Sequence, residues 1–164
     1  MHIGDFREMY IEALVETRSV EIQLIEALGK VPDHAANPDL KQILASHLDE
    51  TRTHKERLDR ILERHNAQEQ DHIDQSMQAI IRETEKWVGM IDSPDLRDAA
   101  LIASCQCIAH YEIADYGTLS TWAKELGLHE DQQALYASLQ EEKKADEALT
   151  ALAKRNINLR AIAA

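Results

Sequence analysis

The sequence predicts an all-α protein: a bundle of four long helices in which one long connection carries an additional, shorter helix. Three observations lead to this fold class. Helix-favouring residues such as Ala, Leu, Glu and Gln are abundant, and only five glycines and three prolines interrupt the 164 residues. Most of these breakers lie between long segments that have apolar residues at helical spacing. The connections between these segments also differ greatly in length.

Capping residues mark where each long helix begins and ends. Asp5 opens a capping-box start, and the motifs "NPDL" (37–40) and "SPDL" (93–96) each place a capping side chain before a proline in the first helical turn. Gly29 and Gly127 follow helical segments and favour termination there. The predicted long helices span residues 5–29, 38–65, 94–126 and 130–153.

A fifth segment, residues 71–91, lies between the second and third long helices and has apolar residues at helical spacing, including Ile73, Ile80 and Trp87. About thirty residues separate those two helices, enough to travel the length of a bundle and return, whereas the other connections are short turns. Two hairpins joined by one long crossover form the ferritin-like arrangement of four helices. We predict one domain, residues 1–164, with a tail too short to count as a further helix.

Composition and charge exclude several classes of function. The formal net charge of −12, without a stripe of Lys and Arg, argues against binding to nucleic acid or to an anionic membrane surface. The amino terminus has no apolar signal core, and no apolar run approaches the length that spans a membrane. Cys105 and Cys107 are two residues apart on a helix, a spacing that suits reduced thiols better than a disulfide or a zinc clip. We expect a soluble, cytoplasmic protein.

Acidic residues interrupt the predicted buried face of every long helix. Alternating steps of four and three residues trace one buried stripe along each helix, and the stripes are apolar except near the middle. The second helix follows this pattern only with a slip of one residue. The interrupting acids are Glu21, Glu50, Glu112 and Glu142, with His54 and Asp146 one turn further along the second and fourth helices.

These glutamates are expected to lie at one level of the bundle. In an antiparallel hairpin, Glu112 and Glu142 fall within about 3 Å of each other along the helix axis, and Glu21 and Glu50 within about 6 Å. Carboxylates gathered in a low-dielectric interior repel one another, and the desolvation of each is unfavourable unless a proton or a cation compensates. No Lys or Arg lies on these stripes, so shared protons and metal ions are the two remaining explanations.

Metal ions are the favoured explanation. Several carboxylate oxygens with one imidazole suit iron or manganese, and this many carboxylates suit two ions about 3.5–4 Å apart. A structural zinc site would use more sulfur and nitrogen. We therefore predict a site for two iron ions, with manganese as the alternative. The predicted ligands are Glu21, Glu50, His54, Glu112, Glu142 and Asp146.

Longer motifs carry a further indication: "HLDET" and "ERLDRI" in the second helix, "RDAALIASCQCIAHYEIADYGTL" in the third and "LQEEKKADEALTAL" in the fourth. Together they resemble the YciF-like ferritin-like family of bacteria, over nearly the whole chain. The resemblance implies a dimeric ferritin-like bundle that carries a two-metal carboxylate site. It implies no particular reaction or substrate.

The wider ferritin-like pattern has one Glu on the first and third helices and a Glu-x-x-His motif on the second and fourth. The four glutamates named above match its glutamate positions. The partner positions differ, because His54 follows Glu50, and Asp146 follows Glu142, at i+4; this spacing still keeps each pair on one helix face. The resulting five carboxylates and one imidazole form a harder ligand set than the usual four and two, which keeps manganese as an alternative to iron.

Other polar residues near the stripes are less strongly indicated as metal ligands. His47 is interpreted chiefly as a core histidine, with a role in orienting a ligand as the alternative. Glu141 would replace Glu142 if the fourth helix were rotated by one residue. Asp115 could ligate metal or form a hydrogen bond to another helix, and His110 is interpreted as structural.

Three functions are compatible with this site. A two-metal centre could react with oxygen or peroxide, or oxidise ferrous iron, in a protective stress response. Metal could instead stabilise a non-enzymatic structural or interaction protein, a homodimer built on the crossover helix through Ile73, Ile80 and Trp87. The third possibility is a bundle without metal in which the acids are protonated.

Overall fold

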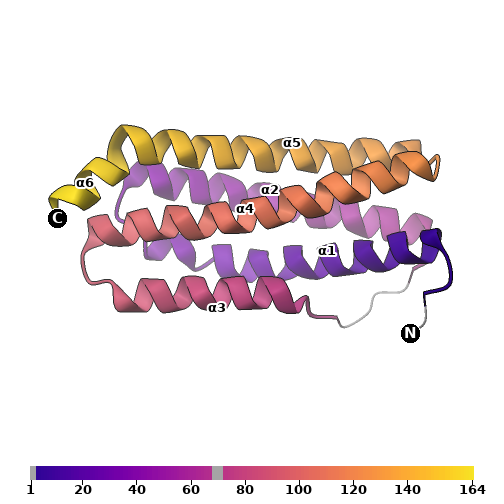
Figure 1. The fold of residues 1–164 in the computed structure, drawn as a ribbon, viewed down its shortest axis with the longest axis horizontal. Coiled ribbons are helices and arrows are strands. Elements are labelled where there is room, and N and C mark those ends of the chain that lie inside the picture. The colour runs from indigo at the N-terminus through magenta and orange to yellow at the C-terminus, as the bar shows by residue number, and fades with distance from the viewer. Residues whose placement is uncertain (1–2, 68–71) are drawn as a thin grey trace.

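The computed structural model describes residues 3–67 and 72–164, and the regular structure within these ranges is entirely helical. Four long helices form the bundle shown in Figure 1: α1 (Phe6–Leu28), α2 (Pro38–Arg64), α4 (Pro94–Glu125) and α5 (His129–Leu152). The connection between α2 and α4 carries α3 (Gln75–Met90), and a short 3-10 turn, η1 (Val31–Asp33), precedes α2. The predicted fold class, a four-helix bundle with one long crossover and an extra helix, is confirmed.

Local sequence explains where the helices begin and end. The Oδ1 atom of Asp5 accepts a hydrogen bond from the backbone N–H of Glu8 at 2.8 Å. Asn37 and Ser93 accept backbone N–H groups in the first turns of α2 and α4 in the same way. After α4, Gly127 has a φ of +71°, a left-handed conformation that residues with a Cβ rarely adopt. Each of these turns is therefore encoded by the residue that occupies it.

The connections arrange the helices as two antiparallel hairpins, α1 with α2 and α4 with α5, and α3 runs beside α1 and α4 (Figure 1). The predicted crossover segment began at residue 71, which lies outside the described residues, as do residues 1–2 of the predicted domain. Among the described helices, none has both the length and the apolar character needed to cross a membrane.

The carboxyl-terminal tail differs from the expectation. The α5 helix continues through a π-helical turn, η2 (Ala153–Ile157), into a short helix, α6 (Asn158–Ala163). Ile157 is 2% exposed and belongs to the apolar core, and Arg155 pairs with Asp39 at 2.8 Å. A helix as short as α6 is unstable alone, and it is held to the bundle through the preceding turn and through the ion pair of Arg160 with Asp95 at 2.8 Å.

A layer of polar side chains divides the apolar core into two clusters. On α2, Leu44 belongs to one cluster and Leu58 to the other, and buried His47 and His54 lie between them. The same division occurs on the other long helices, where a buried glutamate separates apolar residues of the two clusters. The middle of the bundle is thus polar at a level where leucine would pack without any need for a partner.

Candidate metal centre

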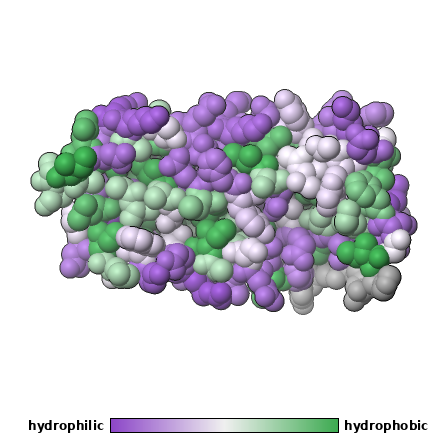
Figure 2. Space-filling model, viewed as in Figure 1, coloured by the Kyte–Doolittle hydropathy of each residue, from purple (hydrophilic) through white to green (hydrophobic). Residues whose placement is uncertain are grey.

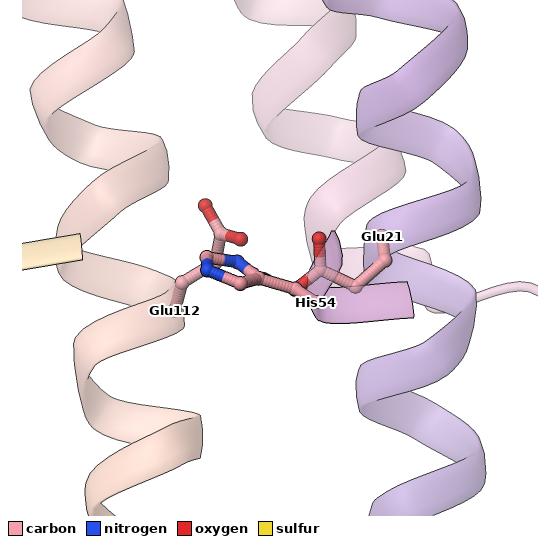
Figure 3. Close-up of side chains that lie close together, drawn as sticks. All are labelled: Glu21, His54 and Glu112. Atoms are coloured by element: carbon pink, nitrogen blue, oxygen red, sulfur yellow. Dashed lines mark ion pairs between the residues drawn. The ribbon is translucent and has the colours of Figure 1, made fainter. Parts of the chain in front are cut away.

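Five buried side chains make up this layer, and we call them the polar layer. All four long helices contribute, and each side chain is at most 2% exposed. Figure 3 shows the carboxylates of Glu21 and Glu112 and the ring of His54 pointing toward one another across the bundle. The members of the polar layer are Glu21 of α1, His47 and His54 of α2, Glu112 of α4 and Glu142 of α5.

The polar layer contains two groups of three possible metal ligands that share one carboxylate. Glu21, His54 and Glu112 form the first group, and His47, Glu112 and Glu142 form the second. Within each group the ligand atoms all lie within 4.8 Å of one another. Glu112 is therefore the one residue of the polar layer that would belong to both positions if two ions were bound.

The contacts between these side chains are close but incomplete. His47 Nε2 lies 3.1 Å from Glu142 Oε1 and 3.9 Å from Glu112 Oε2. His54 Nδ1 lies 3.6 Å from Glu21 Oε1 and 3.5 Å from Glu142 Oε1. The possible metal-ligand atoms therefore lie close together, but most of them are not joined by hydrogen bonds.

Four buried atoms of the polar layer lack a hydrogen-bond partner among the described residues: Glu21 Oε2, His54 Nδ1, and both Glu112 oxygens. Leaving one buried polar group unsatisfied costs about 1–3 kcal/mol. Unpartnered atoms of this kind, gathered at one point and all of metal-ligating types, are what a cation site requires. The residues present therefore fit a metal centre.

Electrostatics indicates how strongly the layer favours compensating charge. Burial raises the pKa of Glu112 well above its usual value, and the charges of Glu142 and Glu21 raise it further. At His54, burial alone would lower the pKa, but the hydrogen bond with Glu141 and the charge of Glu21 outweigh it and raise the pKa to about 9. Without metal, positive charge on imidazole and protons on carboxyl groups would balance the layer.

Tyr116 adds a polar contact at the edge of the layer. Its hydroxyl donates a hydrogen bond to Oε1 of Glu21, and its ring meets that of His54 edge-on at a centroid distance of 5.5 Å. Burial, together with the nearby charges of Glu21 and Glu112, raises the pKa of Tyr116 well above its usual value, so the phenol remains a donor. This bond occupies Oε1 of Glu21, whereas Oε2 has no hydrogen-bond partner among the described residues.

Of the six ligands predicted from the sequence, the structure brings four together: Glu21, His54, Glu112 and Glu142. The other two are not members of either ligand group. Glu50 is half-buried, because the adjacent Thr51 takes the inward position on α2. Asp146 is also half-buried, and it accepts a hydrogen bond from Gln106 of α4 at 2.8 Å.

His47 enters the ligand groups although its sequence position favoured a role in the core. The sequence did contain a feature that favours this position: His47 and His54 are seven residues apart and therefore share one helix face. Glu141, the alternative to Glu142, lies on the rim. It contacts His54 Nε2 at 2.8 Å and pairs with Arg57, and these two bonds lower its pKa to about 2.

The observed donor set differs from the expected one. Three carboxylates and two imidazoles face the centre, in place of five carboxylates and one imidazole. Imidazole nitrogen suits iron, zinc, copper and nickel, whereas carboxylate oxygen suits manganese, magnesium and calcium. The donor set therefore combines nitrogen and oxygen ligands and contains more nitrogen than the sequence predicted.

A four-helix bundle with one long crossover and a buried carboxylate–histidine layer at mid-height defines a ferritin-like class of helical protein. Within that class, the chain belongs to the family described as "Domain of unknown function (DUF892)", which it matches over residues 5–162. It is 36% identical to Protein YciF of Escherichia coli (strain K12) over 162 residues, which is 98% of each chain. The resemblance inferred from the sequence motifs is thereby confirmed.

Solved structures agree with this assignment. The crystal structure of the E. coli stress protein YciF superimposes with a TM-score of 0.90 at 37% identity, covering 95% of this chain and 99% of that one. YcfI of Rhodopseudomonas palustris gives a TM-score of 0.87 at 35% identity, covering 90% and 94%. A protein of Xanthomonas campestris pv. campestris gives 0.74 at 20% identity over 92% of each chain, which supports the fold alone.

Proposed function

We propose that this protein binds two metal ions, iron or manganese, in the polar layer, and that the loaded centre reacts with oxygen or peroxide in a stress response. The observation that carries the proposal is a set of four unpartnered buried ligand atoms, two of which are the oxygens of Glu112, the carboxylate shared by both ligand groups. The similarity to a protein called a stress protein supports the biological setting.

Each side chain of the polar layer has a distinct part in this proposal. Glu112 would contact both ions, with His54 and Glu21 completing one position and His47 and Glu142 the other. Bound iron would supply the capacity for electron exchange with a small oxidant. Because these side chains are at most 2% exposed, they exclude bulk water and restrict any reactant to a small molecule.

Metal analysis tests the proposal directly. Elemental analysis of the purified protein, followed by anaerobic titration with Fe²⁺ or Mn²⁺, should give two ions per chain. Glu112→Ala should bind fewer, whereas Glu147→Ala, an exposed position on α5, should bind as many as the wild type. A peroxide-dependent change in absorbance of the iron-loaded protein would support the redox role. A wild-type protein that takes up neither ion would overturn the proposal.

A structural or interaction role is the second candidate. An apolar groove of about 310 Å³ lies between α3 and α4, lined by residues that include Ile80, Trp87 and Ala103. Trp87 is 49% exposed and Met90 is 71% exposed on the same helix. Figure 2 shows hydrophobic side chains on this face among a largely hydrophilic surface. The related YcfI carries a name that proposes a structural role for that protein.

In this second role, metal would stabilise the bundle and the groove would contact another copy of the chain. The wild type should then be a dimer by light scattering, and Trp87→Ser should weaken the dimer without changing the metal content. Metal should raise the melting temperature while the loaded protein shows no spectral response to oxidants. A monomer at all concentrations would exclude the homodimer.

A further inference from the structure

Glu141 lies beside the polar layer but outside it, and its contacts are unusually specific. Its side chain is 28% exposed, and Oε2 lies 2.8 Å from Nε2 of fully buried His54. Arg57 donates to both carboxylate oxygens of Glu141, with Nη2 to Oε1 at 3.1 Å. Nη1 of Arg57 also donates to Ser138 Oγ at 3.0 Å. The guanidinium thus holds Glu141 at a defined position on α5.

Consecutive glutamates of α5 face the two nitrogens of the same imidazole. Glu141 is within hydrogen-bond distance of Nε2, whereas Glu142 lies 3.5 Å from Nδ1. A carboxylate that is paired with arginine can only accept hydrogen bonds, so Nε2 of His54 carries the hydrogen. Nδ1 is then the nitrogen directed into the polar layer, and it is the one without a hydrogen-bond partner among the described residues.

The other histidine of the polar layer, His47, shows that the ring nitrogen facing the layer is set separately for each histidine. His47 presents Nε2, not Nδ1, to Glu142 and Glu112, at 3.1 Å and 3.9 Å. Both histidines lie on α2, so the helix does not impose one ring orientation on them. The orientation of His54 must therefore come from a partner of its own, and Glu141 occupies that place.

We propose that Glu141, held by Arg57, is a positioning residue that selects Nδ1 of His54 as the metal-facing nitrogen. This inference rests on the proposed metal site. Metal binding displaces any proton on Nδ1, while the bond from Nε2–H to Glu141 keeps the ring from turning and makes Nδ1 a better donor. Glu141 does not itself contact the ions.

Zinc serves as a diamagnetic probe for the test. Histidine-selective ¹⁵N NMR of the Zn²⁺-loaded wild type should show His54 bound through Nδ1, with a slowly exchanging, downfield Nε2–H. Removal of an orienting partner of this kind weakens metal binding about 10–100-fold, so Glu141→Ala should show a loss of that size for Zn²⁺ and lose the Nε2–H signal. Glu141→Gln keeps an accepting oxygen and should recover most of both.

Glu147→Ala, at an exposed position on the same helix, is the matched control and should change neither readout. If Glu141→Ala binds Zn²⁺ as tightly as the wild type with the same ring orientation, the positioning role is refuted while the metal site stands. If the wild type binds no metal, the proposed function fails and this inference with it. The wild-type spectrum decides the matter even if the alanine variant does not fold, because ligation of His54 through Nε2 would overturn the inference.

Discussion

Replacing Glu112 with leucine is expected to stabilise the metal-free protein, although this residue lies at the centre of the proposed metal site. The carboxyl group is fully buried, and neither oxygen has a hydrogen-bond partner among the described residues. Burial, with the charges of Glu142 and Glu21, also raises its pKa, which reflects the unfavourable environment of the ion. Leucine has a similar volume and no polar atom, so it removes the free-energy cost of the buried, unsatisfied carboxyl group without opening a cavity.

The magnitude follows from the cost of a buried unsatisfied group, about 1–3 kcal/mol. The free energy of unfolding of the metal-free variant should therefore exceed that of the wild type by about 2 kcal/mol, or about 4–8 °C in melting temperature for a chain of this size. Metal reverses the order. An ion at 100 times its Kd adds about 2.7 kcal/mol to the wild type, and the variant loses most of that gain.

Urea unfolding at neutral pH, followed by circular dichroism with chelator and then with Mn²⁺, measures both effects. Leu119→Ala is the control, because Leu119 lies on the same helix and is 1% exposed. It should lose about 2–5 kcal/mol under both conditions. If metal-free Glu112→Leu is less stable than the wild type, the carboxyl group makes a favourable interaction that its geometry does not reveal, and the reasoning is wrong.

Three further changes have defined outcomes. Burial and neighbouring carboxylates raise the pKa of Asp115 from 3.8 to about 7, so the wild-type protein loses stability as pH rises through this interval. The urea midpoint of Asp115→Asn should therefore exceed that of the wild type above pH 7 and equal it below pH 4. Asp131→Ala should cost about 1–3 kcal/mol in urea unfolding, because it leaves the buried Tyr10 hydroxyl without its hydrogen-bond acceptor, whereas Arg64 still pairs with Glu130 at 3.1 Å; an unchanged stability would show that solvent replaces the carboxylate. His47→Ala should reduce the metal content from two ions to one in elemental analysis. An unchanged metal content would show that His47 packs in the core and does not bind metal.

The helices and their order could be predicted because their determinants are local. Asn37 and Ser93 cap the helices that follow them whatever the rest of the chain does, since the capping bond joins residues two or three positions apart. Connection lengths then limited the topology, because a segment as long as 71–91 can cross a bundle and a short turn cannot. These features require no knowledge of which helix contacts which.

Four members of the polar layer were also accessible to sequence analysis. Glu21, Glu112 and Glu142 each lie among leucines and other apolar residues on a buried stripe, so a small error in helix rotation leaves them inside. His54 shares the inward face of α2 with Leu58. A charged or polar residue in such a position indicates a compensating partner, because burial without one is unfavourable. That physical constraint, not any motif, is what made the site visible.

The sequence by itself determined the helices, the crossover topology and the acidic interruption of the core; the tertiary structure decided which neighbouring residue faces inward. Successive residues on a helix differ by about 100° in direction, so a modest rotation of α2 exchanges Glu50 for Thr51. On α5 the same uncertainty separates Ala145, which is buried, from Asp146, which contacts Gln106. Helix rotation is set by side-chain packing between helices, and that packing involves contacts between residues far apart in the chain.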